Sequence, residues 1–226
     1  MGQMIQFPSN GHTCSGYLAV PETGQGPGLL VLQEWWGLVD HITEVCDRFA
    51  REGFVALAPD LYHGSHTRSP DEAGKLFMAL NIAKASADLR GAADALVLRR
   101  EVTSKRVGVM GFCMGGQLAL YAATEYPDRF ACGVNFYGVH PNVRIDPARV
   151  KVPIQGHFGT QDTSTTEPEA RELVRKIEAA GGQVEAHFYN AGHAFFNDTR
   201  PTVYDREAAR LSWERTLTFL RKHLTA

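Results

Sequence analysis

Short runs of consecutive apolar residues alternate along this chain with longer segments in which apolar residues recur every three or four positions. A short continuous apolar run is typical of a strand covered on both faces, and the wider spacing is typical of an amphipathic helix. Alternating strands and helices predict an α/β fold with a mostly parallel central sheet and helices on both faces. The expected parallel strands cover residues 28–32, 54–58, 107–110, 131–136, 153–158 and 184–188.

The beginning of the chain has a different pattern. Ile5 and Phe7 alternate with polar neighbours, and Ser9-Asn10-Gly11 is typical of a turn, so residues 4–19 predict an antiparallel hairpin. Asp40 is expected to cap the first helix, and Ser69 is expected to form a capping box with Glu72 at the second. The expected helices run from Asp40 to a stop at Gly53, from Ser69 to about Leu80, and over 82–100, 117–123, 166–180 and 203–224.

The overall composition fits a single domain over residues 1–226. Hydrophobic residues make up 44% of the chain and charged residues 21%, which allows a sizeable core. The net charge of -2 argues against a nucleic-acid or anionic-membrane surface. The sequence has no secretory signal and no apolar run of about eighteen residues, so we expect a cytoplasmic protein without a membrane span. Its four cysteines have no CxxC pairing, which favours reduced thiols.

A glycine-rich turn stands between an expected strand and an expected helix at Gly111–Gly116. Strand, tight turn and helix is the context of a nucleophile elbow, which usually carries serine and here carries Cys113. Glycines two residues before and after Cys113 are expected because side chains there would collide with neighbouring elements. The N–H of Met114 then lies at a helix N-terminus, where negative charge is stabilised.

Taken alone, Cys113 is better explained as a buried apolar cysteine. The enzymatic interpretation depends on Asp162 and His193, which follow later strands in the order nucleophile, acid, histidine of α/β-hydrolases. His193 would exchange the thiol proton, and Asp162 would hold the imidazole in the useful tautomer. By themselves, Asp162 is typical of a turn and His193 of the surface. With Glu34, these residues end four expected strands, and the carboxyl ends of such strands form the site.

The chain resembles the dienelactone hydrolase family along nearly all of its length. The segments that carry the resemblance are Gln33–Gly37, Ala58–Tyr62, Gly111–Gly116, Phe136–Gly138, Gly159–Asp162 and Ala191–His193. The resemblance implies an α/β-hydrolase fold, a triad of Cys113, Asp162 and His193, and an oxyanion hole formed by the N–H groups of Met114 and Trp35. It implies a hydrolase that needs no cofactor and no metal.

Glu34 has a physical interpretation of its own. A carboxylate beside a thiol disfavours a second negative charge, so the resting Cys113 would stay neutral. By the resemblance, substrate moves the glutamate, which takes the thiol proton and leaves a thiolate beside an imidazolium. The alternative is that Glu34 caps a helix or forms a loop salt bridge.

The substrate-binding positions depart from the family pattern. Two arginines bind the carboxylate of an enol-lactone in founding members, and the corresponding residues here are Asn197 and Pro70. Arg200 or Arg68 could substitute for them. The residues expected to contact substrate are Trp36, Phe77, Phe195, Asn197 and Arg200, with Trp35 and Phe196 adding to an aromatic lining.

The favoured function is hydrolysis of a small activated ester or lactone through a thioester acyl-enzyme, by a monomer or small homo-oligomer. The alternative is a non-catalytic thiol sensor or binding protein on a hydrolase scaffold, because a cysteine at a helix start also suits redox sensing. A metal site is not expected, since grouping Asp60, His63 and His66 on one loop is a weak pattern.

Overall fold

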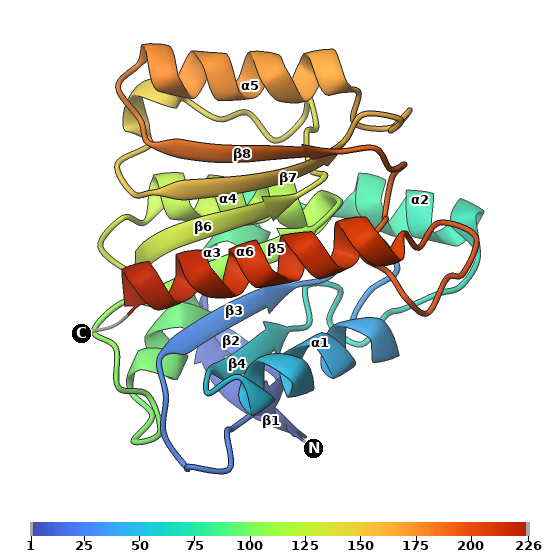
Figure 1. Cartoon of the computed structure of the whole chain (residues 1–226). Helices are drawn as coiled ribbons and strands as arrows, with labels where there is room; N and C mark the ends of the chain where they lie inside the picture. Colours follow the sequence, from blue (N-terminus) through green and yellow to red (C-terminus); the bar gives the residue numbers. More distant parts are fainter. Residues whose placement is uncertain (1, 225–226) are drawn as a thin grey trace.

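The structure is a computed structural model that describes residues 2–224. Across these residues one sheet has the strand order β1-β2-β4-β3-β5-β6-β7-β8 (Figure 1). β1 and β2 form an antiparallel hairpin, β2 pairs antiparallel with β4, and all later pairings are parallel. The strands are β1 Gln3–Ser9, β2 His12–Ala19, β3 Gly28–Leu32, β4 Val55–Pro59, β5 Val107–Phe112, β6 Phe130–Phe136, β7 Ile154–Gly159 and β8 Val184–Tyr189. The predicted α/β class and the N-terminal hairpin are both confirmed.

Helices cover both faces of the sheet. α1 and α6 cross the near face in Figure 1, where their apolar residues share a core with β3, β5 and β6. α3 and α4 cover the other face, with Leu89 and Leu118 in a second core. The helices are α1 Asp40–Arg51, α2 Pro70–Ala79, α3 Ile82–Val97, α4 Met114–Glu125, α5 Glu167–Ala179 and α6 Arg206–Leu224. None of the helices within residues 2–224 combines the length and the apolar composition needed to cross a membrane.

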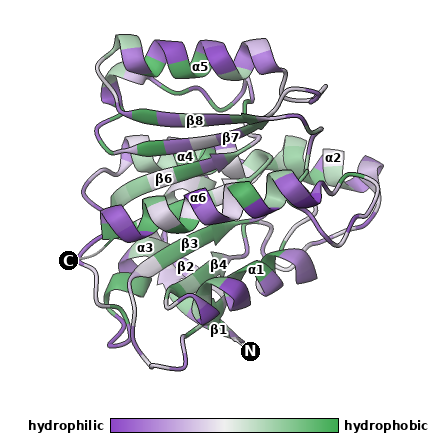
Figure 2. Ribbon diagram, viewed as in Figure 1, coloured by the Kyte–Doolittle hydropathy of each residue, from purple (hydrophilic) through white to green (hydrophobic). Residues whose placement is uncertain are grey.

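The central strands are buried along their whole length. Every residue of β3, β4, β5 and β7 is buried, as their apolar sequences predict for strands covered on both faces. Figure 2 shows β3 and β4 largely in the hydrophobic colour, whereas hydrophilic and hydrophobic stretches alternate along α5 and α6. The burial fixes the strand ends in place, which gives the loops that follow them a rigid support.

The predicted helix boundaries differ more from the structure than the predicted strands do. Ser69 makes no side-chain capping bond to α2, and Glu72 instead pairs with Lys75 at 2.7 Å. Asp40 is the first residue of α1 rather than its cap. α6 begins at Arg206 and not at residue 203, because the Asp205 carboxylate accepts a bond from the Ala208 N–H at 2.8 Å and caps the helix there. The third helix ends at Val97 rather than at residue 100.

Candidate active site

Four polar residues gather at the carboxyl edge of the sheet. Glu34 follows β3, Cys113 follows β5, Asp162 follows β7 and His193 follows β8. Since β3 and β5 are neighbours, as are β7 and β8, these loops meet above the strands from which they emerge.

Cys113 stands in a strained turn between β5 and α4. Its backbone has φ 54° and ψ -118°, a region that residues with a side chain rarely adopt. A Cβ on Gly111 would lie 2.2 Å from the carbonyl oxygen of Gly115, and one on Gly115 would lie 2.4 Å from that of Gln33. The steric reason given for these glycines is therefore confirmed. The turn leaves Cys113 partly exposed, whereas Cys14, Cys46 and Cys132 are buried.

Two backbone N–H groups beside Cys113 are available to a ligand. Met114 is the first residue of α4, and Trp35 lies in the loop after β3. Neither N–H donates a hydrogen bond to another of the described residues. The close approach of Gly115 to Gln33 brings the start of α4 against the loop that carries Trp35. Two free donors and a helix N-terminus suit a developing oxyanion.

His193 is held by a buried carboxylate. Its Nδ1–H donates to Asp162 Oδ2 at 2.7 Å, and the Asp162 side chain is fully buried. The other carboxylate oxygen of Asp162 accepts bonds from the N–H groups of Ser164 at 2.7 Å and Thr165 at 2.9 Å. These bonds fix the carboxylate, which in turn orients the imidazole so that Nε2 is free to meet a nucleophile.

The surroundings of His193 favour its charged form. Burial lowers the pKa of His193, but the bond to Asp162 and the interaction with Cys113 outweigh it and raise the pKa from 6.5 to about 10. This balance favours the imidazolium over the neutral ring beside Cys113. A cation in that position stabilises a thiolate.

Glu34 is almost completely buried and hydrogen-bonded on one oxygen only. Asn197 Nδ2 donates to Glu34 Oε2 at 2.9 Å, whereas Oε1 has no partner among residues 2–224. Burial raises the pKa of Glu34. The bond from Asn197 and the charges of His193 and Arg200 act in the opposite direction but are weaker, so the pKa stays above its usual value. A carboxyl with a raised pKa and a free oxygen can accept a proton from a neighbour.

Comparison with known proteins places the chain in a family. The family model described as the dienelactone hydrolase family matches residues 14–224. This chain belongs to the dienelactone hydrolase family. It is a hydrolase of esters or lactones.

Relatives in this family align over most of the chain. The protein usf of Aquifex pyrophilus is 40% identical over the whole length of both chains. The carboxymethylenebutenolidase of Pseudomonas sp. (strain P51) is 37% identical, with 91% of this chain and 89% of that one aligned. A dienelactone-hydrolase-type crystal structure from Klebsiella pneumoniae is 28% identical and superposes with a TM-score of 0.87 over 98% of each chain.

Tyr137 belongs to the site of this dienelactone hydrolase family member, and the sequence pattern gave it no role. It follows β6, and its ring lies edge-on to that of His193 with centroids 5.1 Å apart. Its backbone φ is 42°, and Thr165 Oγ1 donates to its carbonyl at 3.0 Å. Its hydroxyl makes no hydrogen bond of ordinary geometry within residues 2–224, but it interacts with Glu34, and burial together with that carboxylate raises the pKa of the phenol well above 10. The burial of this ring closes the site behind the histidine.

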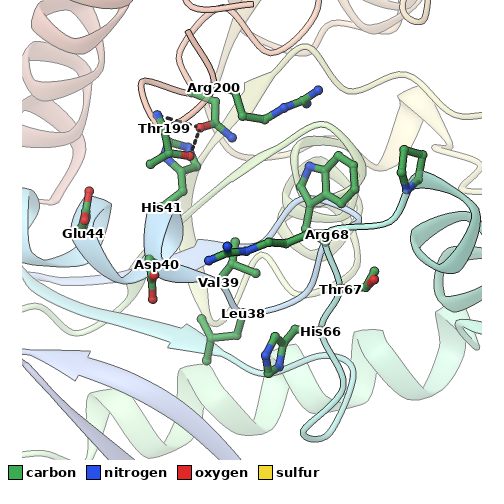
Figure 3. Close-up of a pocket in the computed structure, with 13 residues that line it drawn as sticks. Leu38, Val39, Asp40, His41, Glu44, His66, Thr67, Arg68, Thr199 and Arg200 are labelled. Carbon is green, nitrogen blue, oxygen red and sulfur yellow. Dashed lines mark hydrogen bonds between the residues drawn. The ribbon is translucent and has the colours of Figure 1, made fainter. Parts of the chain in front are cut away.

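A pocket of about 1070 Å³ opens beside Glu34. Trp36, Asn197 and Arg200 line it, as the sequence predicts for substrate-binding residues, and Arg68 joins them from the loop after β4 (Figure 3). The Arg200 guanidinium lies over the Trp36 ring at 5.2 Å. Neither Cys113 nor His193 is part of the lining, and Asn197, which lines the pocket, connects it to the candidate site through its bond to Glu34.

Two of the expected substrate contacts lie elsewhere. Phe195 has no exposed surface, and its ring packs against Tyr137 and Tyr189 in the core, so the expectation that it lines the pocket is wrong. Phe77 lies on α2 with its ring 4.6 Å from that of His140. It is half-buried and outside the lining of the pocket. An aromatic residue near a histidine in sequence does not reveal which face of its loop is buried.

Proposed function

We propose that this chain hydrolyses activated esters or lactones with Cys113 as nucleophile and a thioester acyl-enzyme as intermediate. The observation that carries the proposal is the pairing of a strained, partly exposed cysteine at a helix N-terminus with a histidine that a buried carboxylate holds. A thiolate beside an imidazolium is the usual activated form of a cysteine nucleophile.

In the first half of the reaction, the Cys113 thiolate attacks the carbonyl carbon of the substrate. The carbonyl oxygen becomes an oxyanion, which the N–H groups of Met114 and Trp35 would bind. The tetrahedral intermediate collapses to a thioester, and His193 gives its Nε2 proton to the departing oxygen. In a lactone this oxygen stays attached to the acyl group, so the opened product remains on the enzyme.

In the second half, water replaces the sulfur. His193, now neutral, takes a proton from the water as its oxygen attacks the thioester carbonyl. The second tetrahedral intermediate collapses to a carboxylic acid and regenerates the Cys113 thiolate beside the imidazolium. Thiolates are good leaving groups and modest bases, so we expect enol and aryl esters to react faster than alkyl esters.

We assign Glu34 the role of a proton acceptor for the Cys113 thiol. Its free Oε1 and its raised pKa support this role, and Asn197 holds the opposite oxygen in place. An arginine at position 197 would keep Glu34 ionised, whereas the neutral amide leaves it able to change its protonation state. A substrate that displaces the carboxyl would bring it to the thiol, where it takes the proton and leaves a thiolate beside His193.

Hydrolysis of an aryl acetate tests the proposal. Cys113→Ala should reduce kcat/KM by at least about 10³-fold, whereas Cys132→Ala, which removes a buried thiol of β6, should stay within about twofold. Mass spectrometry of quenched wild type should find an acyl group on the peptide that carries Cys113. Equal rates for Cys113→Ala and wild type would remove Cys113 from the mechanism. Stoichiometric oxidation without turnover of any ester would favour the thiol sensor instead.

A further inference from the structure

A second group of cysteine, histidine and carboxylate side chains lies where the hairpin, the loop after β4 and α3 meet. It consists of His12 and Cys14 on β2, His63 in the loop after β4, and Asp88 on α3. One ligand atom from each of the four lies within 4.8 Å of every other. The sequence did not suggest this group, because it spans 77 positions and combines a strand, a loop and a helix.

The distances between these atoms fit tetrahedral coordination. Cys14 Sγ lies 3.3 Å from His12 Nε2, which lies 3.4 Å from Asp88 Oδ1. His63 Nε2 lies 3.4 Å from Asp88 Oδ2. Zinc bound at its usual Zn–N, Zn–O and Zn–S lengths would separate neighbouring ligand atoms by roughly 3.3–3.6 Å. These three separations fall in that range, and the remaining pairs of ligand atoms lie within 4.8 Å of each other.

The hydrogen bonds around the group orient it toward a cation. His12 Nδ1–H donates to the carbonyl of Asn10 at 3.3 Å, so in the neutral ring the lone pair of Nε2 faces Cys14 and Asp88. The Ser9 hydroxyl lies within hydrogen-bond reach of Asp88 Oδ1 at 3.3 Å and of the backbone carbonyls of Asp88 at 3.3 Å and Ala87 at 3.4 Å. Ligating histidines and carboxylates in metal sites usually have such supporting bonds on their outer side.

Two of the four proposed ligands are buried and two are exposed, which suits metal entry. Asp88 and Cys14 are buried, so their side chains are fixed by the surrounding core. The side chains of His12 and His63 are 44% and 49% exposed, which leaves a path from solvent. A thiolate, two imidazoles and a carboxylate form a ligand set of the kind that Zn²⁺ prefers.

We propose that His12, Cys14, His63 and Asp88 form a Zn²⁺ site that joins the N-terminal hairpin to the loop after β4 and to α3. The site is separate from the candidate triad and does not depend on the proposed hydrolysis. Its occupation ties three segments that otherwise meet through side-chain packing and hydrogen bonds.

Cobalt provides a direct test of the thiolate ligand. The Cys113→Ala protein is treated with a chelator, freed of it and titrated with Co²⁺, so that the nucleophilic thiol cannot contribute. We expect one equivalent to bind with a thiolate-to-cobalt charge-transfer band, and Zn²⁺ to displace it. Adding Cys14→Ser should abolish the band, whereas adding Cys132→Ala should leave it. Absence of the band from the Cys113→Ala protein would overturn the proposal.

Calorimetric titration with Zn²⁺ tests the other ligands. His63→Asn is suited to this because asparagine tolerates the φ of 51° at this position but supplies no imidazole. His63→Asn and Asp88→Asn should each weaken Zn²⁺ binding at least 100-fold, and His187→Asn, which changes a histidine of β8, should leave it unchanged. Zn²⁺ at a hundred times Kd should raise the Tm of the parent protein by about 5–10 °C. Unchanged affinity in both ligand variants would contradict the site.

Discussion

Two groups of the same three residue types lie at different places in this molecule. At the carboxyl edge of the sheet, Cys113 stands on a strained turn and meets a histidine that Asp162 holds. At the hairpin, Cys14 lies within a regular strand and meets two histidines around Asp88. Residue type alone therefore does not decide what such a group does.

The backbone and the burial make the difference. The strained turn presents Cys113 to solvent at a helix N-terminus, beside a cation. In contrast, burial and the neighbouring Asp88 raise the pKa of Cys14 to about 11, so its thiol stays protonated at neutral pH unless a metal displaces the proton. The environment of Cys113 therefore favours a nucleophile, and that of Cys14 favours a metal ligand.

Replacing the aspartate of each group with asparagine should give the largest difference in kcat/KM. Asp162→Asn should lower kcat/KM for an aryl acetate by roughly 10³- to 10⁴-fold, because the amide would face Nδ1 with an N–H and force the wrong tautomer on His193. Asp88→Asn should change kcat/KM by less than about threefold. Steady-state kinetics of both variants, with circular dichroism to verify folding, checks this. A similar loss in both would mean that the aspartates act through overall stability.

The pH dependence of stability should separate His193 from the exposed histidines. Its pKa is raised from 6.5 to about 10, so its stabilising contribution is complete below pH 6.5 and is lost as the pH rises through 10. We expect the free energy of unfolding to fall by about 2–5 kcal/mol over this window. Urea unfolding between pH 6.5 and 10 measures it. His193→Gln should flatten the decline and His63→Asn should not, and an equally steep decline in His193→Gln would contradict the assignment.

Removing the ionisable group of Glu34 should have a smaller effect. Glu34→Gln keeps the shape and the neighbour Asn197 but cannot take a proton, so kcat should fall by about 10-fold or more. The same variant should be alkylated faster at Cys113 in the absence of substrate, because the carboxylate no longer disfavours a thiolate. Full turnover in Glu34→Gln would exclude its role as proton acceptor.

The smallest expected effect concerns Ser9, which lies next to the proposed zinc ligand Asp88. Ser9→Ala removes the hydroxyl that lies within hydrogen-bond reach of Asp88 Oδ1, and this should weaken Zn²⁺ binding by about 10-fold. Aryl acetate turnover should not change. Calorimetry and steady-state kinetics on the same protein sample measure both. If Ser9→Ala lowered turnover but not Zn²⁺ affinity, Ser9 would support the candidate active site and not the proposed zinc ligands.

The sequence was most informative where local pattern and structure coincide. The buried strands have continuous apolar runs, and the elbow needs glycines on both sides of Cys113 for steric reasons that the structure confirms. The family assignment followed from the same segments and is confirmed. The roles of Cys113, Asp162 and His193 remain predictions that the kinetic variants test.

What the sequence missed depends on contacts between distant segments. His63 reaches Asp88 only because β2 pairs with β4 and because α3 packs on the hairpin. Phe195 was expected to line the pocket but lies in the core. Nothing in the sequence of a loop shows which of its side chains will be buried. The capping box expected at Ser69 failed because Glu72 pairs with a lysine one turn along the helix. Short polar motifs have several competing partners, which only the folded chain selects.

The loop between β4 and α2 carries His63 near its start and Arg68 near its end, only five residues apart. Between them the Thr67 N–H donates to the Trp36 carbonyl at 3.0 Å, so the end of the loop that lines the pocket is anchored independently of His63. An ion bound at His63 would therefore leave the choice of acyl groups to the far end of the same loop.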